Sequence, residues 1–372
     1  MLQQQSSLWA RRGGRAGARA GMGTLGGPAG LDSSMGGTGS ICTDHSMQSD
    51  LSSSLTSAAR RGGGGSSLAQ YELEGKLGTG KFSTVWRARH VPSGKRVALK
   101  TVQIFEIVDP KQRADCIREV NMLQSLENSN IVRYLDSFIE DNELVIVLDW
   151  AEGGDLGKVL KDRQAAGHFF QEQEVLAIFS QVCAAVHHMH ERRIMHRDLK
   201  PSNILISNEG VKVGDMGLSR YFSSRTAEAH SVVGTPYYMS PQCIKGLPYD
   251  WGSDVWSLGC LLYELITLRS PFYEQGLNYY SLGKRITSCD FPPLPATVSR
   301  NLRLMVYAML NVHPECRPKV AILGRAAIAA SQGVDLFQWT DTNRLLVPHK
   351  LSKYLLGLTQ ERQRDLAQAG RA

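Results

Sequence analysis

Two short polar stretches of the chain carry side chains suited to phosphate transfer. "HRDLKPSN" holds Asp198, Lys200 and Asn203 between apolar flanks, and "VGDMG" adds Asp215 twelve residues further on. Asp198 could accept the proton of an attacking hydroxyl, and Lys200 could reach the transferred phosphate. The oxygens of Asn203 and Asp215 suit a Mg²⁺ ion held mainly by phosphates and water. A polar surface turn is the plain alternative for the first stretch.

A second group of residues is suited to holding nucleotide phosphates. In "LGTGKFSTV", residues 77–85, Gly78 and Gly80 would let the backbone pass close to phosphate oxygens. By itself this pattern also fits a plain hairpin. Lys100 ends the alternating run "VALK", where its charge could neutralise phosphates if Glu119, on the next predicted helix, holds it in place. A solvated Lys at a strand end and an ordinary surface Glu are the alternatives.

The order of predicted elements would position these residues in an α+β fold. Short β-like runs begin at Tyr71 and include "YELEGKLG", "STVWRARH" and "RVALKTVQI", separated by Gly and Pro. Longer helical runs follow, including "EQEVLAIFSQVCAAVHHMHER". The sequence therefore predicts a small β-rich lobe followed by a larger helical lobe.

The two ends of the chain differ from its centre. Residues 1–68 are rich in Gly, Ser and Arg and lack the apolar surface to offset ordering entropy, which predicts a disordered tail. A transit peptide is an alternative that the glycine content disfavours. In the C-terminal extension, residues 331–372, Leu351, Tyr354, Leu355 and Leu358 recur at helical spacing. They predict a short amphipathic helix that either packs back on the domain or docks to a partner.

The bulk composition narrows the class of protein. The chain has 372 residues and a net charge of +7, with the excess spread along it rather than gathered in one block, which argues against a nucleic-acid partner. Seven cysteines lie far apart and form no C-x-x-C pair, which favours a reducing compartment. No apolar run reaches the roughly 20 residues of a membrane span. We expect a soluble intracellular protein.

Several motifs taken together resemble the eukaryotic protein kinases. They are "GTGKFSTV", "VALK", "HRDLKPSN", "DMG", "GTPYYMSP" and "SDVWSLG", in this order, between about Tyr71 and Ala330. Within that family "TVQIFEIVDPKQRADCIREV", "FIEDNELVIVLDWAEGGDL" and "YFSSRTAEAHSVVGTPYYMSP" are similar to the NIMA-related kinases, most closely to short members that are little more than a kinase domain. The resemblance implies a bilobal kinase fold, with an N-lobe at about 71–148 and a C-lobe at about 152–330. ATP and Mg²⁺ would lie between the lobes.

The resemblance also implies roles for individual residues. Asp198 would be the catalytic base, assisted by Lys200 and Asn203, and Asn203 and Asp215 would bind magnesium. Lys200 and Thr235 are similar to residues of serine/threonine-specific kinases, so the substrates would be protein Ser and Thr hydroxyls. The expected ATP-binding residues are Leu77, Gly78, Gly80, Val85, Ala98, Lys100, Glu119, the hinge residues Asp149, Trp150 and Ala151, Asp155 and Asp215.

Regulation can be inferred from Arg197, which precedes the expected base. A cation in that place needs an anion to hold it, and a phosphate on the activation segment is the usual source in the family. Ser231 matches the phosphorylated serine of short NIMA-related kinases, which implies an upstream activating kinase. Alternative sites of phosphorylation are Ser223, Ser224 and Thr226, whose hydroxyls could also be ordinary solvated groups of a loop.

Three positions depart from the family pattern. Ser83 replaces the third glycine of the phosphate loop, and Met216 replaces an apolar Phe or Leu. Gln242 stands where the family has a Glu that pairs with an Arg, here Arg317 in "ECRP". A neutral amide loses charge-assisted, bidentate geometry, so we expect Gln242→Glu to raise the melting temperature.

Two rival functions share the fold, and the cellular role is open. A pseudokinase would bind partners without catalysis, and a small-molecule phosphotransferase would lack the platform built by "GTPYYMSPQ" and "SDVWSLG". The basic tails could also anchor the chain to nucleic acid or membrane, although their Arg residues are sparse. NIMA-related kinases act in mitosis, microtubule organisation and cilia. The resemblance therefore implies microtubule or centrosome partners and a cytoplasmic location, with cytoskeleton, centrosome or nucleus as alternatives.

Overall fold

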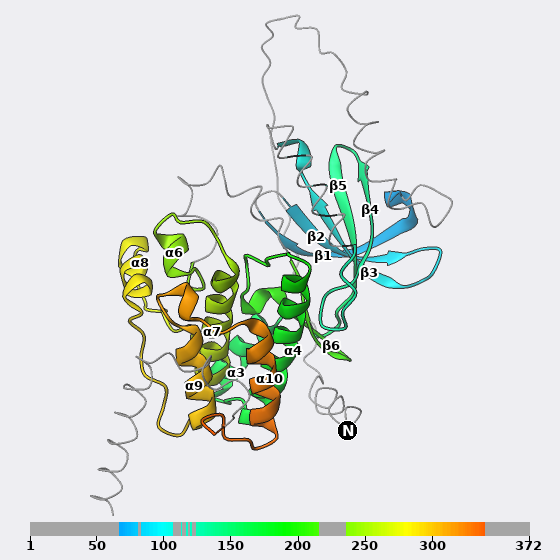
Figure 1. Ribbon diagram of the computed structural model, residues 1–372. Coiled ribbons are helices and arrows are strands. Elements are labelled where there is room, and N and C mark those ends of the chain that lie inside the picture. The colour runs from blue at the N-terminus through cyan, green and yellow to red at the C-terminus, as the bar shows by residue number, and fades with distance from the viewer. Residues whose placement is uncertain are drawn as a thin grey trace, which may run out of the picture.

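The computed structural model describes residues 67–80, 83–106, 113, 117, 120, 124–215 and 236–338. The expected N-terminal tail lies outside the described residues except for its last two, and so does the predicted helix of the C-terminal extension. Within the described part, a β-sheet lobe precedes a helical lobe, which confirms the predicted α+β, bilobal fold (Figure 1). The exact lobe boundaries stay predictions.

The N-lobe is one antiparallel sheet with strand order β1-β2-β3-β5-β4. Successive side chains of these strands point to opposite faces of the sheet, and the run "LVIVL" is apolar throughout because both faces of that strand are covered. The strands are β1 (Tyr71–Thr79), β2 (Ser83–His90), β3 (Arg96–Val102), β4 (Tyr134–Glu140) and β5 (Glu143–Asp149), with the short 3₁₀ turns η3 (Leu68–Gln70) and η4 (Ile104–Glu106) at its margins.

Each face of this sheet carries its own apolar cluster. Val97 and Leu99 of β3 pack on one face with residues of β2, β4 and β5. Val102 packs on the other face, where the buried Ile117 and Val120 cover the sheet. Lys100 is two residues from Val102 and therefore lies on this second face. The alternation of side chains along β3 thus places Lys100 on the face of the sheet that Ile117 covers.

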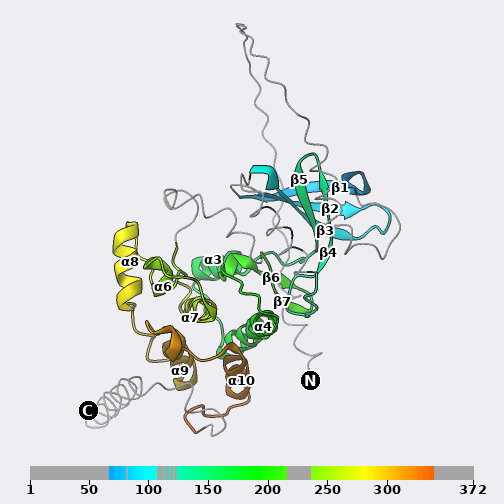
Figure 2. The same cartoon turned by 45° about the horizontal axis from the view of Figure 1, so that its top comes forward.

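The C-lobe is built around one helix that is buried on nearly all sides, α7 (Trp251–Thr267). Helices α4 and α10 pack against each other, and α7 packs against both α4 and α9. The other helices are α3 (Leu156–Ala166), α4 (Glu172–Glu191), α6 (Pro241–Ile244), α8 (Tyr279–Ser288), α9 (Arg300–Met309) and α10 (Val320–Ser331), with 3₁₀ turns η5 (Pro201–Asn203) and η6 (Pro314–Cys316). In both views α8 lies on the side of this lobe away from the sheet (Figures 1 and 2). None of the described helices combines the length and apolar character that a membrane crossing requires.

A two-stranded hairpin joins the lobes. Strands β6 (Ile204–Ser207) and β7 (Gly210–Val213) lie between α4 and the large sheet (Figure 2). The Val132 N–H donates to the Val213 carbonyl at 2.9 Å, and the Val213 N–H donates to the Asn130 carbonyl at 2.8 Å. These bonds hold the end of β7 against the chain that leads into β4. The loop before β6 and the turn after β7 are thereby fixed at the border between the lobes.

Candidate active site

The loop between α4 and η5, which contains Asp198, is held by a buried carboxylate. Asp254, in the first turn of α7, is fully buried and accepts hydrogen bonds from the backbone N–H groups of His196 and Arg197, both at 3.0 Å. It also accepts from His190 Nε2 at 2.8 Å and from the Tyr249 hydroxyl at 2.5 Å. Arg197 has a φ of +70°, a conformation that costs energy in a residue other than glycine. The bond to Asp254 helps to hold that conformation.

Asp254 remains ionised because its donors outweigh its burial. Burial alone would raise its pKa, but the hydrogen bond and charge of His190, with further donation from Tyr249, lower the pKa below its usual range. Asp254 lies in the motif "SDVWSLG" but was not among the site residues predicted from the sequence. A lone acid at the start of an apolar helix was the sequence signal that could have identified it, since buried acids need partners.

The same loop places Asp215. The Gly214 N–H donates to the Asn203 carbonyl at 2.8 Å, and His196 Nε2 donates to the Gly214 carbonyl at 2.9 Å. The backbone N–H of Asp198 lies 3.3 Å from His196 Nδ1, so a neutral imidazole protonated at Nε2 satisfies both contacts. His196 is fully buried. Because both the N–H and the carbonyl of Gly214 are hydrogen-bonded, the next residue, Asp215, is held close to Asn203.

Asp198, Lys200 and Asn203 form one polar cluster. Lys200 Nζ lies 2.7 Å from Asp198 Oδ2, and Asn203 Nδ2 donates to the Asp198 carbonyl at 2.7 Å and to Oδ2 at 3.0 Å. The Asp198 side chain is 35% exposed, whereas Asn203 is buried. Because the amide nitrogen of Asn203 faces Asp198, its oxygen points the other way and is suited to bind a cation. A hydroxyl from solvent can reach the carboxylate of Asp198.

Lys100 and Asp215 form an ion pair between the lobes. Lys100 Nζ, on β3, donates to Asp215 Oδ1. The charge of Lys100, acting against burial, lowers the pKa of Asp215. Asp215 has a φ of +53°, so its backbone is held in the left-handed region. Glu119, the predicted partner of Lys100, lies outside the described residues.

The sheet register brings the expected nucleotide-binding residues together. Gly78 pairs with Val85, and Val85 pairs with Lys100 across three adjacent strands. Ala98 is two residues from Lys100 and shares its face. Leu77 is half exposed on β1. Gly78, Val85, Ala98 and Lys100 therefore share one face of the sheet next to the Lys100–Asp215 pair, and Leu77 adjoins Gly78 on β1.

The segment between β5 and α3 carries the remaining expected nucleotide contacts. Ala151 is buried, and the Asp149 N–H donates to the Arg133 carbonyl at 2.8 Å, so that donor is already used. Asp155 is the N-cap of α3, and its Oδ1 accepts from the Lys158 N–H at 2.9 Å. The structure thus gives Asp155 a capping contact, and its contact with a nucleotide stays a prediction.

The oxygens near Gly214 fit a magnesium ion that is held partly by phosphates. Asn203 and Asp215 each supply an oxygen donor from a separate loop, a donor set typical of Mg²⁺ in nucleotide complexes. Among the described residues, no group of three or more His, Cys, Asp or Glu side chains could hold a metal ion by itself. An ion here would therefore need oxygens from its ligand and from water.

The predicted regulatory residues are placed only in part. Ser231 and Thr235 lie outside the described residues, as do Met216 and the three alternative hydroxyls. The Arg197 guanidinium lies 5.9 Å from the centre of the Tyr249 ring. Within the part of the chain that is described, no carboxylate lies within ion-pair distance of that guanidinium.

Gln242 joins Arg317 to the start of α7. Arg317 Nη2 donates to Gln242 Oε1 at 3.1 Å, while Nε and Nη1 donate to the carbonyls of Asn311 and Gly252 at 2.7 and 2.6 Å. The amide nitrogen of Gln242 donates to Asp250 Oδ1 at 2.9 Å. Only one nitrogen of the guanidinium faces position 242, so a Glu there would gain no bidentate pair and would meet the Asp250 carboxylate. This arrangement reverses our expectation that Gln242→Glu stabilises the protein.

Comparison with known proteins places the chain in a family. The family model described as protein kinase domain matches residues 71–325. Over 256 residues the chain is 38% identical to "Probable serine/threonine-protein kinase nek3" of Dictyostelium discoideum and 39% identical to "Serine/threonine-protein kinase Nek1" of Mus musculus. These matches cover 68% of this chain but only 22% and 21% of the two relatives, so the chain spans about a fifth of their length.

A shorter relative is matched over most of its length. The chain is 37% identical over 262 residues to "Serine/threonine-protein kinase nekl-2" of Caenorhabditis elegans, which covers 68% of this chain and 72% of the relative. The predicted likeness to NIMA-related kinases is confirmed by these matches. The chain therefore belongs to the protein kinase family, among the NIMA-related (Nek) serine/threonine kinases.

Proposed function

We propose that the protein transfers the γ-phosphate of ATP to Ser and Thr hydroxyls of protein substrates. The observation that carries this proposal is the continuous set of contacts from Lys100 through Asp215 and Gly214 to Asn203 and Asp198. It links a cation on the sheet to a carboxylate that solvent can reach. The names of the three relatives, all serine/threonine-protein kinases, support the same activity.

Each residue of this set has a role in the proposed reaction. The substrate hydroxyl oxygen bonds to the γ-phosphorus, the bond from that phosphorus to ADP breaks, and the hydroxyl proton passes to Asp198. Lys200, 2.7 Å from Asp198 Oδ2, stabilises charge on the transferred phosphate. Lys100 moves from Asp215 to the nucleotide phosphates when ATP enters. Mg²⁺ bound by Asn203 and Asp215 would neutralise charge on those phosphates.

The first experiment is transfer of labelled phosphate from ATP to a generic protein substrate, followed by identification of the labelled residue. Asp198→Asn removes the proton acceptor and keeps the shape, so we expect the rate to fall about 10²- to 10⁴-fold. Asp162→Asn, an exposed position on α3, is the matched control and should leave the rate unchanged. A chelator of divalent cations should abolish transfer in both the wild type and the control.

Two results would contradict the proposed activity. Label that persists at the wild-type rate in Asp198→Asn would remove the assigned role of that carboxylate. No transfer by the wild type, even after treatment with an activating kinase, would favour a pseudokinase that binds partners.

We also propose that phosphorylation of Ser231 activates the enzyme through Arg197. The absence of a described carboxylate beside the Arg197 guanidinium supports this proposal, because a phosphate would then supply its anion. Ser231→Ala should lower the rate of phosphate transfer, and Ser231→Asp should partly restore it. Equal rates for the two variants and the wild type would refute the proposed switch, and Ser224→Ala serves as the control for a nearby hydroxyl.

The cellular role is a further proposal that rests on the family. The protein would act in cell-cycle, microtubule or ciliary regulation, from a cytoplasmic, centrosomal or nuclear location. Co-sedimentation of the purified chain with microtubules, compared at low and high salt, tests the microtubule association directly. Pelleting that is unchanged by microtubules would count against it.

A further inference from the structure

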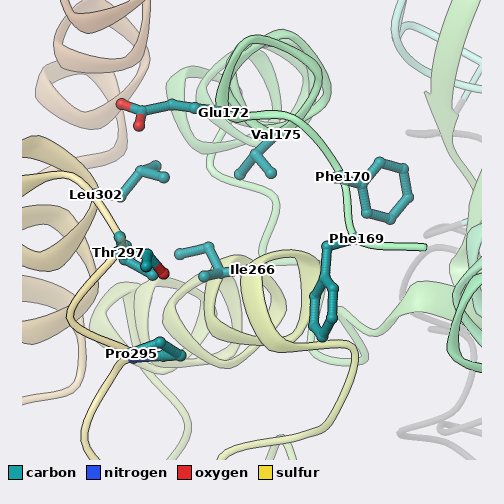
Figure 3. A pocket seen from close by; sticks show the side chains of 9 residues that line it. Phe169, Phe170, Glu172, Val175, Ile266, Pro295, Thr297 and Leu302 are labelled. Carbon is teal, nitrogen blue, oxygen red and sulfur yellow. The ribbon is translucent and has the colours of Figure 1, made fainter. Parts of the chain in front are cut away.

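An apolar pocket opens in the C-lobe at the end of α4 remote from the catalytic loop. It has a volume of about 330 Å³. Figure 3 shows its walls, which come from the loop before α4, the first turn of α4, the end of α7 and the segment that leads into α9. The apolar lining includes Phe169, Val175, Ile266, Val298 and Leu302. Since α4 has 20 residues, about 30 Å of helix separates this pocket from the loop of Asp198.

Side-chain contacts hold one wall of the pocket, and the residue at its mouth is exposed. The Arg163 guanidinium stacks on Phe170 at 3.8 Å from the ring centre and pairs with Glu174 at 3.0 Å. Glu174 in turn accepts from the Gln171 N–H at 2.8 Å. Phe169, by contrast, leaves 60% of its surface in water, although Val175 beside it is buried. A preformed apolar hollow with an exposed Phe at its mouth is suited to receive another apolar surface.

The described chain ends on the first turn of α9, the helix that contributes Leu302 to this pocket. Asn301 Nδ2 donates to the Val334 carbonyl at 2.8 Å, and the Leu336 N–H donates back to Asn301 Oδ1 at 3.0 Å. The Arg300 guanidinium lies 3.5 Å from the ring centre of Phe337. These contacts fix the chain on the first turn of α9, where the next residue, Leu302, lines the pocket. The described chain therefore ends on the same helix turn that carries Leu302.

We propose that the stripe Leu351, Tyr354, Leu355 and Leu358 docks into this pocket of its own chain. Leu351 lies thirteen positions after Gln338, and an extended chain over that many steps reaches about 43 Å, so the tether does not limit access. A tether this short gives an effective concentration on the order of millimolar, which favours the chain's own segment over a free partner.

Charge and volume also fit this occupant. Glu172 lies at the rim, where its Oε1 accepts from the Ser299 hydroxyl at 2.6 Å. Lys350 and Lys353 flank the start of the stripe and carry the opposite charge. The pocket is at the small end of the range of about 300–1,000 Å³ for ligand sites. It accommodates two or three large side chains from one face of a helix, and the remainder of the stripe covers Phe169.

Hydrogen exchange of the full chain tests the docking, with amides 351–358 as the readout. Leu355→Asp changes the stripe, and Phe169→Asp changes the pocket at an exposed position that the fold tolerates. Ser352→Asp, off the stripe, and Tyr280→Asp, an exposed aromatic on α8, are the matched controls. We expect exchange about 10-fold faster in both test variants than in the wild type, and no change in the controls. Exchange within α7 verifies that each variant is folded.

Three outcomes would overturn the proposal. Amides 351–358 that exchange equally fast in the wild type and in Leu355→Asp would mean that the stripe is not docked. Protection that survives Phe169→Asp would place the stripe on another surface. Protection that disappears on dilution would identify a second copy of the chain as the occupant.

Discussion

Two loops of the C-lobe are fastened to the same first turn of α7 by different chemistry. The catalytic loop is held by the carboxylate of Asp254, which accepts four hydrogen bonds. The segment at the start of α6 is held by the neutral amide of Gln242. This amide accepts a hydrogen bond from Arg317 and donates to Asp250 and to the Ser253 hydroxyl. One anchor is a buried charge with donors only, and the other is a neutral group that joins a cation to an anion.

The difference shows how each group suits its surroundings. A buried carboxylate is stable only where its neighbours donate, and the described groups that bond to Asp254 do so. Around Gln242 one neighbour is a donor and another is a carboxylate, and an amide can satisfy both because it has an oxygen and a nitrogen. Replacing the carboxylate of Asp254 by an amide, or the amide of Gln242 by a carboxylate, should therefore lower the stability of the protein. The loss should be larger at Asp254.

The largest effect is expected for Asp254→Asn. The new amide nitrogen would face two of the four donors and leave them buried without an acceptor. We expect unfolding free energy to fall by roughly 3 kcal/mol and phosphate transfer to fall about 100-fold, because the catalytic loop shifts. Chemical denaturation and the transfer assay measure the two effects. Asp162→Asn, which is exposed, should change stability by less than about 0.5 kcal/mol.

An intermediate effect is expected from acid. The folded-state pKa of Asp254 lies below its unfolded value, so its contribution to stability is full above about pH 4 and is lost as pH falls through the folded pKa. Asp215, whose pKa the Lys100 charge lowers, acts in the same direction. We expect the free energy of unfolding, measured by chemical denaturation at several pH values from 7 to 3, to fall less steeply with decreasing pH for Asp254→Asn than for the wild type. Parallel curves would show that Asp254 does not carry the acid sensitivity.

The smallest effect is expected for Gln242→Glu. The carboxylate would face Asp250 Oδ1, now 2.9 Å from the Gln242 amide nitrogen, and would gain only one charge-assisted bond from Arg317. We expect a loss of about 1 kcal/mol, measured as a lower melting temperature. Adding Asp250→Asn should lessen the loss, since Asn removes the charge that repels the new carboxylate and its amide oxygen can still cap α7. A single variant more stable than the wild type would show that Arg317 dominates this site.

Much of the site could be predicted from local sequence. Asp198, Lys200 and Asn203 lie within one loop, so their proximity follows from chain connectivity. The two faces of β3 follow from the period of two that strands impose. The contact between Lys100 and Asp215 needed the packing of the lobes, because these residues are 115 positions apart. The pairing of Lys100 with Glu119 and the role of Ser231 stay predictions.

The sequence by itself determined the kinds of side chain available, their order and the α+β pattern, because the hydrophobic periods of 2 and 3.6 are local properties. Tertiary structure alone decided which buried groups meet. Asp254 holds the N–H of Arg197 from 57 positions away, and Gln242 lies between Arg317 and Asp250. Such partners depend on how α7 packs among its neighbours, and the free energy of a buried polar group depends on those partners rather than on its residue type.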